Sequence, residues 1–415
     1  MAFSLVAQQW VTDVTLFVVE EDSRNRDHNL RGNNKLKIIY YPTYNVHEQM
    51  SNIDHFSNNA AADCSYMSPP DLNLEILDSI HGELKKYFEI AKDYHLIQAL
   101  CLQQYQVCIN ELRYYPLYPI FQLIGCKHIV ATSNMPLESI YYYYLGLLPN
   151  IIHNGIPVVL RRKPNKHGET SSSNNPHELA VSQRKKEIKK FDIFFKQIGE
   201  NMGIEENYFK NIIKYVIRFI FVNTQFLIDF EAMSDILIDQ EKIINIGGIA
   251  IQQNNQALNR QEANIFNFAS QNDKQIIFVS FGTMITSQHL TDIQIYNLVK
   301  NFSQSNYLFI WAIEDVEYKI FSILDNYNRT NNIFIFNRVD QKAILAHSLT
   351  ILFISHCGIN SSIEAVKYGK PLLCVPFIAD QFYNSQALAS REVAGIVDKD
   401  DNFENLEQYI SYAIR

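Results

Sequence analysis

The chain has 415 residues, of which 47% are hydrophobic and 13% aromatic, so it can bury a large core, and disorder of the whole chain is excluded. Its formal net charge of -8 argues against a broad electrostatic contact with nucleic acid or anionic lipid, because such contacts use clustered Lys and Arg. We therefore expect small molecules as partners and no nucleic acid.

The first half of the chain alternates between strand and helix patterns. β-branched and aromatic runs predict strands, and apolar residues at helical spacing predict helices. Strands are predicted within 14–20, 35–42, 105–110, 219–230 and 242–251, and helices over 1–10 and 72–102. Because strands alternate with helices, the pattern favours a parallel α/β sheet.

The second half follows the same pattern more regularly. Strands are predicted within 274–282, 306–314, 331–337, 349–355 and 370–377. Helical patterns lie between most of these strands, which indicates a doubly wound sheet. The polar segment 252–261 before them is typical of an interdomain linker. We therefore expect a first domain over 1–250, a linker over 251–262 and a second domain over 263–415.

The cysteines are widely spaced and include no C-x-x-C pair, so they indicate neither a zinc site nor a dense disulfide framework. They are Cys64, Cys101, Cys108, Cys126, Cys357 and Cys374. We interpret them mostly as small apolar residues within strands. No apolar run reaches the length of a membrane span, and the first residues lack the pattern of a signal peptide.

Polar side chains gather after two successive predicted strands in the segment 350–384. His356 and Gly358 follow one strand, and Asp380 and Gln381 follow the next. In an open α/β sheet, ligands bind beyond the carboxyl ends of the strands. A helix predicted to begin near Asn360 would present unpaired N–H groups and a partial positive charge, which suit a phosphate group.

Two simpler interpretations stand beside this one. Ser361 and Glu364 also form an S-x-x-E capping box, which many helices use without a ligand. His356 by itself is more typical of a packed histidine. The coincidence of two polar clusters on one sheet edge favours a ligand with a charged middle and a hydroxyl-rich end.

The order and spacing of these residues resemble the signature of the UDP-glycosyltransferases, the family that includes the glucuronosyltransferases. The matching positions are Gln341, His356-Cys357-Gly358, Asn360-Ser361, Glu364, Gly369, Pro371, Pro376 and Asp380-Gln381. The segments VSFGT (279–283), FVNTQFLIDF (221–230) and INIGGI (244–249) are similar to the animal branch of the family. The resemblance implies a GT-B fold, in which two Rossmann-like domains face a cleft. The second domain then binds the nucleotide sugar, and the first binds the acceptor.

The resemblance also implies a role for each matching side chain. His356, Asn360 and Ser361 are expected on the diphosphate, together with the backbone at Gly358. Other donor contacts are expected from Glu364 on the ribose hydroxyls, Gln341 near the nucleoside, Asp380 with Gln381 on the sugar hydroxyls, and Thr283 near the phosphates. As an alternative, Thr283 is an ordinary turn or N-cap hydroxyl. No metal site is expected.

This chain departs from the family pattern just before the histidine. The family has Trp-x-Pro-Gln, with an indole that stacks on uracil, whereas this chain has Arg338-Val339-Asp340-Gln341. A guanidinium plane can stack on a base, although its apolar face is smaller. Arg338 is therefore included among the expected donor-binding residues.

The ends of the chain also differ from the family pattern. The resemblance implies an earlier strand and a loop with the histidine that acts as general base, and a transmembrane helix near the other end. We expect that this chain is truncated at both ends and that its N-terminal domain is incomplete. Glu111 lies where the family has the acid that orients the base, and the alternative is an ordinary carboxylate at a strand end.

The function that the resemblance implies is transfer of a hexosyl or glucuronosyl group from UDP-glucose or UDP-glucuronic acid to a small lipophilic acceptor. The reaction would be inverting and independent of metals and cofactors, since the UDP-sugar is a co-substrate. The full-length family pattern implies the lumenal side of the endoplasmic reticulum membrane. One alternative is a non-catalytic UDP-sugar-binding relative or inactive fragment, and another is a different GT-B enzyme such as a UDP-sugar epimerase.

Overall fold

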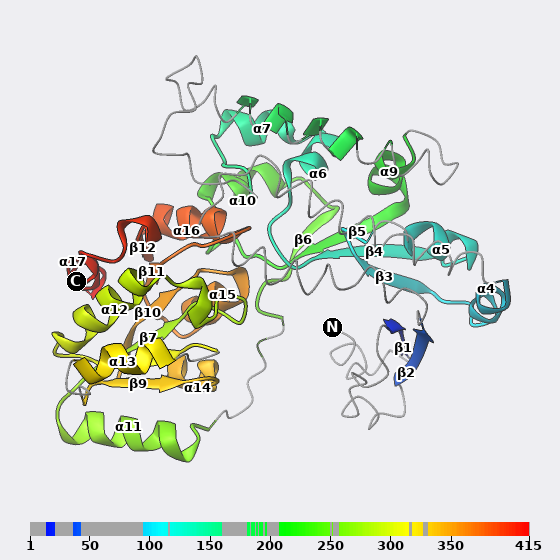
Figure 1. Ribbon diagram of the computed structural model, residues 1–415. Helices are drawn as coiled ribbons and strands as arrows, with labels where there is room; N and C mark the ends of the chain where they lie inside the picture. The colour runs from blue at the N-terminus through cyan, green and yellow to red at the C-terminus, as the bar shows by residue number, and fades with distance from the viewer. Residues whose placement is uncertain are drawn as a thin grey trace.

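The computed structural model divides into two parts, each built on a parallel sheet (Figure 1). The described residues are 14–20, 36–42, 94–114, 117–159, several positions between 181 and 196, 207–249, 251, 257–314, 318–326 and 331–414. The predicted helix over 1–10 and most of the one predicted over 72–102 lie outside them. Only α4 (Tyr94–Cys101) of the latter is described.

The second part holds a six-stranded sheet in the order β12-β11-β10-β7-β8-β9. Its strands are β7 (Ile276–Ser280), β8 (Leu308–Ala312), β9 (Ile333–Phe336), β10 (Thr350–Ser355), β11 (Leu372–Cys374) and β12 (Ala394–Ile396). Read from the other edge, this is the 3-2-1-4-5-6 order of the Rossmann fold. The chain therefore changes direction across the sheet between β7 and β10, and ligands of such folds bind at that crevice.

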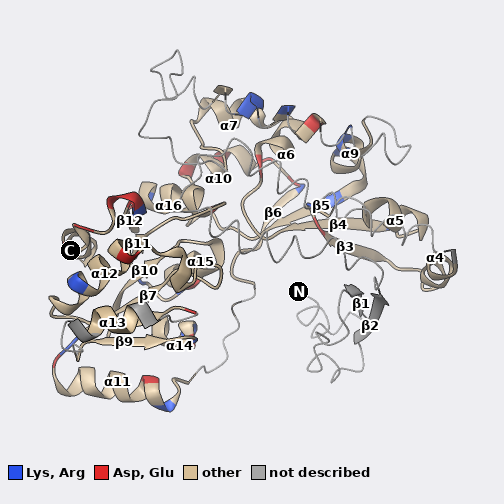
Figure 2. Ribbon diagram, viewed as in Figure 1, with Lys and Arg blue, Asp and Glu red and all other residues tan. Residues whose placement is uncertain are grey.

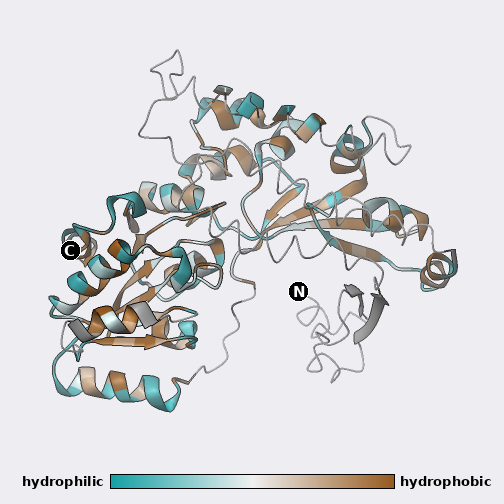
Figure 3. Ribbon diagram, viewed as in Figure 1, coloured by the Kyte–Doolittle hydropathy of each residue, from teal (hydrophilic) through white to brown (hydrophobic). Residues whose placement is uncertain are grey.

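Burial on both faces explains why the strands of this sheet are continuous apolar runs. Every residue of β7 is buried. Ile277 and Val279 belong to one core cluster and Ile276 and Phe278 to another, because alternate side chains point to opposite faces. Figure 3 shows the strands of this sheet mostly in the hydrophobic colour, with mixed colours on the helices around them.

Seven helices of the described chain accompany this sheet. They are α11 (Arg260–Gln271), α12 (Asp292–Ser303), α13 (Tyr318–Asn326), α14 (Gln341–Ala346), α15 (Ile359–Lys367), α16 (Gln381–Ser390) and α17 (Leu406–Ile414). Figure 2 shows their Lys, Arg, Asp and Glu residues dispersed rather than gathered on one face. The helix α11 begins with a capping box, in which Asn259 and Glu262 satisfy each other's backbone N–H groups.

The first part holds a four-stranded parallel sheet in the order β3-β4-β5-β6. Its strands are β3 (Val107–Glu111), β4 (His128–Ser133), β5 (Ile217–Val222) and β6 (Ile243–Asn245). Besides α4, its described helices include α5 (Leu117–Leu123), α6 (Ser139–Tyr144), α7 (Leu148–His153), α9 (Tyr208–Asn211) and α10 (Glu231–Leu237). The strands β1 (Val14–Glu20) and β2 (Leu36–Pro42) form a separate parallel pair.

Helix α16 joins the two parts. Its residues Tyr383 and Ala387 belong to the core cluster of the first part, although the helix follows β11 of the second. The Tyr383 hydroxyl donates a hydrogen bond of 2.7 Å to Asp229, and Arg391 donates one of 2.8 Å to the Asp229 carbonyl oxygen. Burial raises the pKa of Asp229 to about 6. The contact orders the two halves relative to each other, and so positions the edges of their sheets.

The predicted strands are found near where the patterns placed them, but two observed strands were not predicted. One is β4, which lies inside the first sheet between β3 and β5. The other is the short strand β12 at the edge of the second sheet, which was not predicted because it holds three residues that include Gly395. The helix α11 begins at Arg260, within the last residues of the segment expected as a linker. No helix of the described chain combines the length and the apolar character that a membrane span requires.

The interpretation of the cysteines as unpaired apolar residues is wrong for two pairs. Disulfides join Cys108 to Cys126 and Cys357 to Cys374. In each pair the partners lie on or beside neighbouring parallel strands, where the sheet brings residues distant in sequence together. Spacing along the chain carried no sign of this proximity. The Cys357–Cys374 disulfide fixes the first residues after β10 to the end of β11.

Candidate active site

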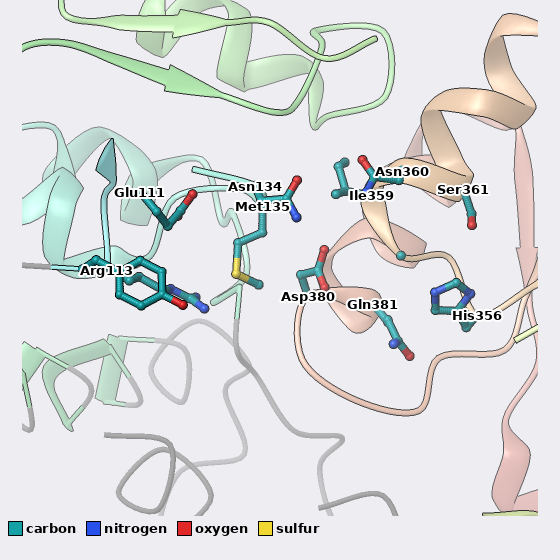
Figure 4. Close-up of a pocket in the computed structure, with 12 residues that line it drawn as sticks. Glu111, Arg113, Asn134, Met135, His356, Ile359, Asn360, Ser361, Asp380 and Gln381 are labelled. Carbon is teal, nitrogen blue, oxygen red and sulfur yellow. The ribbon is translucent and has the colours of Figure 1, made fainter. Parts of the chain in front are cut away.

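A pocket with a volume of about 690 Å³ lies where the carboxyl ends of strands from both halves meet. Figure 4 shows Glu111 and Arg113 on one side, and His356 with Asn360 and Ser361 on the other. The described residues of its lining are Glu111, Arg113, Tyr114, Asn134, Met135, His356, Gly358, Ile359, Asn360, Ser361, Asp380 and Gln381. Glu111 ends β3, the next four follow β3 or β4, and the rest follow β10 or β11.

Helix α15 begins at this pocket. It starts at Ile359, with the extended residue Gly358 at the N-cap position and no cap from that residue's side chain. The interpretation of Ser361 and Glu364 as a capping box is wrong, because the helix begins two residues before Ser361. The start of α15 thus presents backbone N–H groups and the positive end of a helix dipole to the pocket.

His356 is held between two glycines at the switch point of the second sheet. A Cβ atom on Gly282 would lie 2.8 Å from its Cε1 and Nε2 atoms, and one on Gly358 would lie 2.6 Å from Nε2. Burial lowers the pKa of His356 to about 4, an effect that contact with the backbone of Ser280 opposes. At neutral pH the ring is therefore uncharged and carries a single N–H group.

The Gly358→Ala substitution is expected to weaken binding of UDP at least about tenfold. The residue has φ of -60°, which alanine adopts easily, so the only penalty is the collision with the His356 ring. Isothermal titration calorimetry with UDP measures the change. Gly369→Ala, just beyond the other end of α15, is the control. Its φ of +63° strains alanine but the space around it is open, so stability should fall while UDP affinity stays unchanged. Unchanged affinity in Gly358→Ala would contradict the role of His356.

Gln341 links helices α14 and α15. Its amide Nε2 donates hydrogen bonds of 3.2 Å to Ser361 Oγ and 2.8 Å to Glu364 Oε2. Lys342 Nζ lies 3.9 Å from the other oxygen of Glu364. Only Ser361 of these residues lines the pocket. Gln341 therefore orients the Glu364 carboxylate and the Ser361 hydroxyl, whatever ligand they meet.

Two other expected donor residues lie outside the lining. The side chain of Arg338 is 82% exposed, and its Nε donates a hydrogen bond of 3.0 Å to Glu314. The next acidic residue, Asp340, caps α14 by accepting a hydrogen bond from the Ala343 N–H group. Thr283 is exposed in the turn that follows Gly282. The structure thus brings together Glu111, His356, Gly358, Asn360, Ser361, Asp380 and Gln381, and leaves Thr283, Arg338, Gln341 and Glu364 outside the lining.

Asp380 and Gln381 form the start of α16. The Gln381 Oε1 atom accepts hydrogen bonds from the N–H groups of Phe377 and Ile378, which orients its amide in the pocket. Burial raises the pKa of Asp380, opposed by hydrogen bonds from Asn384 and the Ile359 backbone and by the charge of Arg113. These two side chains offer hydrogen-bond acceptors and donors suited to hydroxyl groups.

Glu111 ends β3 on the opposite wall. Burial raises the pKa of its carboxyl group to about 7, while the charge of Arg113 and a hydrogen bond from Thr132 oppose the shift. The Thr132 hydroxyl lies 3.4 Å from Glu111 Oε2. A carboxyl group with this pKa can accept or donate a proton near neutral pH.

Asparagine side chains connect the two walls. Asn223 Nδ2 donates hydrogen bonds of 2.8 Å to Asn360 Oδ1 and 3.2 Å to Asn134 Oδ1. This bridge leaves the Asn360 amide nitrogen to face a ligand. Asn134 and Arg113 were not predicted as site residues. Arg113 stands two residues after β3, a strand that was predicted, whereas Asn134 follows β4, which was not.

The sequence resembles known glycosyltransferases over the part of the chain that carries the donor side of the pocket. Residues 224–403 match the family model described as UDP-glucoronosyl and UDP-glucosyl transferase. The chain is 28% identical over 151 residues to an anthocyanidin 3-O-glucosyltransferase of Solanum melongena, which covers 36% of this chain and 34% of that enzyme. It is 32% identical over 123 residues to an ecdysteroid UDP-glucosyltransferase of Autographa californica nuclear polyhedrosis virus, covering 29% of this chain and 23% of that protein. The matches thus span about a third or less of these curated relatives.

Solved structures of glycosyltransferases are similar in fold over nearly the whole chain. A UDP-glucosyltransferase from Polygonum tinctorium that glucosylates indoxyl superposes with a TM-score of 0.60 at 13% identity, covering 100% of this chain and 87% of that one. A glycosyltransferase from Medicago truncatula in complex with UDP-glucose superposes with a TM-score of 0.59 at 15% identity, covering 97% and 83%. The expectation of a GT-B fold is confirmed. The family expectation is supported over residues 224–403, whereas the animal branch and the truncation stay predictions.

Proposed function

We propose that this chain is a UDP-glycosyltransferase that moves a hexosyl or glucuronosyl group to a small lipophilic acceptor with inversion at the anomeric carbon. One observation carries the proposal. The start of α15, the neutral His356 and the Asp380-Gln381 pair face Glu111 across a single pocket. A diphosphate, sugar hydroxyls and an acceptor hydroxyl each meet suitable groups there. We further propose, from the resemblance to the family, an animal-type enzyme on the lumenal side of the endoplasmic reticulum membrane.

In the proposed reaction the acceptor oxygen attacks the anomeric carbon as the bond from that carbon to the UDP oxygen breaks. The α15 start and the His356 N–H group stabilise the negative charge that develops on the diphosphate. Asp380 and Gln381 hold the sugar hydroxyls, with Glu364 on the ribose. The acceptor proton passes to the acid–base group at Glu111, either directly or through a base that this carboxylate orients.

No metal or cofactor is part of the proposal. The helix start and the His356 N–H group supply the charge stabilisation that a divalent cation provides elsewhere. Within the described ranges, no three His, Cys, Asp or Glu side chains are grouped so as to hold a metal ion.

A UDP-sugar-binding protein without transferase activity is the second candidate. The observation behind it is a departure from the family pattern, since Arg338, at the position of the family's stacking Trp, is exposed and paired with Glu314. A nucleobase would then gain less apolar contact, which lowers the affinity for the donor.

Titration with UDP followed by a transfer assay tests the proposal. UDP is expected to bind the folded chain, and His356→Ala and Glu364→Ala are each expected to weaken binding at least about tenfold, through loss of hydrogen bonds to a charged or hydroxyl group. Transfer from labelled UDP-glucose to a phenol then separates the enzyme from the binder. If UDP does not bind, or if neither variant loses affinity, the donor site is wrong.

A further inference from the structure

The acceptor and sugar end of the pocket has an uneven charge distribution. Arg113 lines the pocket together with Glu111 and Asp380, and its charge acts on both carboxyl groups. A third carboxylate, Glu138, forms an ion pair with the Arg113 guanidinium group. Three acidic groups, from the end of β3 and from the starts of α16 and α6, therefore lie around Arg113, the one Arg or Lys residue among the described residues of the lining.

The ion pair with Glu138 neutralises much of the positive charge of Arg113. Glu138 is 2% exposed and Arg113 is 29% exposed, so the pair lies mostly out of water. A charge pair in such a place is screened little, and separating it leaves a buried carboxylate without its partner. A ligand carboxylate would have to compete with Glu138 for Arg113 while it approaches Glu111 and Asp380.

The opposite end of the pocket has different electrostatics. The start of α15 and the uncharged His356 ring face the groups expected to hold the diphosphate. Their attraction for an anion is local, because the effect of a helix dipole falls off within the first turn. The backbone of Ile359, the first residue of α15, already donates a hydrogen bond to Asp380, so this carboxylate partly offsets the positive helix start beside the groups expected to hold the sugar.

On the basis of the proposed function, we propose that this pocket selects a UDP-hexose with an uncharged sugar over a UDP-hexuronic acid. A sugar carboxylate near Asp380 and Gln381 would meet two carboxyl groups and an arginine already neutralised by Glu138. A hydroxymethyl group at the same position meets hydrogen-bond acceptors and brings no charge. Repulsion between the sugar carboxylate and the ionised forms of these two carboxyl groups accounts for the preference.

Comparison of the affinities for the two donors tests the selectivity. The dissociation constants of UDP, UDP-glucose and UDP-glucuronic acid are measured by calorimetry on the full chain. UDP-glucose is expected to bind at least about tenfold more tightly than UDP-glucuronic acid. Glu138→Gln, which keeps the size of the side chain and releases Arg113, is expected to move the ratio at least about fivefold towards UDP-glucuronic acid and to leave UDP affinity unchanged.

A matched control is available outside the pocket. Glu314→Gln removes the carboxylate that pairs with Arg338, in the same kind of Arg–Glu pair, and is expected to leave the ratio unchanged. If Glu138→Gln unfolds, as circular dichroism would show, Glu111→Gln provides the second variant and is expected to shift the ratio in the same direction.

The outcomes separate the two proposals. Equal or tighter binding of UDP-glucuronic acid by the unchanged chain, with normal binding of UDP, would overturn the selectivity and leave the proposed function standing. The unchanged chain could bind UDP-glucose more tightly while folded Glu138→Gln and Glu111→Gln both keep the original ratio of dissociation constants. That result would show that the carboxyl groups around Arg113 do not cause the selectivity. Failure to bind UDP at all would overturn the donor site and the selectivity together.

Discussion

The Glu111→Gln substitution is expected to lower the rate of glycosyl transfer by about a hundredfold or more, with UDP affinity within about twofold of the original. Glutamine keeps the shape of the side chain but cannot take up a proton or balance a developing positive charge. The group lies at the end of β3, across the pocket from the groups expected to bind the donor. Turnover of labelled UDP-glucose with a phenol gives the rate, and calorimetry gives the affinity.

The pH dependence of the reaction provides a second readout of the same group. Burial raises the pKa of Glu111 to about 7, so the carboxylate form needed to accept a proton or to orient a base gains population as the pH rises through about 7. Transfer should therefore increase from about pH 6 to pH 8, and Glu111→Gln should lose this limb of the profile. Arg113 opposes the shift, so Arg113→Gln should move the limb to higher pH.

The control for both measurements is Glu314→Gln. Glu314 also follows a strand of the parallel sheet, yet it pairs with the exposed Arg338 outside the pocket. Rate and pH profile should stay as in the unchanged chain. A Glu111→Gln variant with full activity would show that Glu111 is an ordinary carboxylate at a strand end, and would favour the interpretation that another group handles the acceptor proton.

The Asp380→Asn substitution is expected to reduce transfer about tenfold to a hundredfold while UDP still binds. A hydrogen bond to a charged acceptor contributes about 1.5–3 kcal/mol, and the substitution removes the charge that would hold a sugar hydroxyl. Asparagine keeps one oxygen to accept the hydrogen bond from the Ile359 backbone, so the start of α15 should stay in place. Steady-state kinetics with UDP-glucose and calorimetry with UDP measure the two effects.

Asp340→Asn is the matched control, because Asp340 also stands at a helix start but lies outside the lining. It should change neither transfer nor UDP binding beyond about twofold. Asp380→Asn would contradict the proposed sugar contact if its loss of UDP affinity equalled its loss of transfer. That result would place Asp380 on the diphosphate instead.

The sequence predicted the parallel architecture well, for a physical reason. Strands such as β7 are buried on both faces, so they stand out as unbroken apolar runs between polar segments. The polar residues after β10 and β11 could also be assigned to one edge, since the carboxyl ends of parallel strands lie on the same side. Their approach to one pocket follows from that rule.

Local sequence patterns did not show the contacts of side chains that pair with residues distant in the sequence. Ser361 and Glu364 match a capping box by spacing, yet the helix begins at Ile359, and Gln341 from another helix takes both side chains. Arg338 is expected to meet a base, which stays a prediction, and in this structure its guanidinium group donates a hydrogen bond to Glu314, two residues after strand β8. In each case the side chain pairs with a residue distant in the sequence.

The sequence by itself determined the alternation of strands and helices and the set of polar residues after β10 and β11, because both depend on neighbours along the chain. Only the tertiary structure decided which of those residues share a pocket, because α16 packs into the core of the first half and brings the two sheet edges together. It also decided the chemistry of single groups. Burial makes His356 neutral and raises the pKa of Glu111, and the ion pair with Glu138 occupies Arg113. Burial and pairing between distant residues are properties of the packed chain, and no spacing along the sequence contains them.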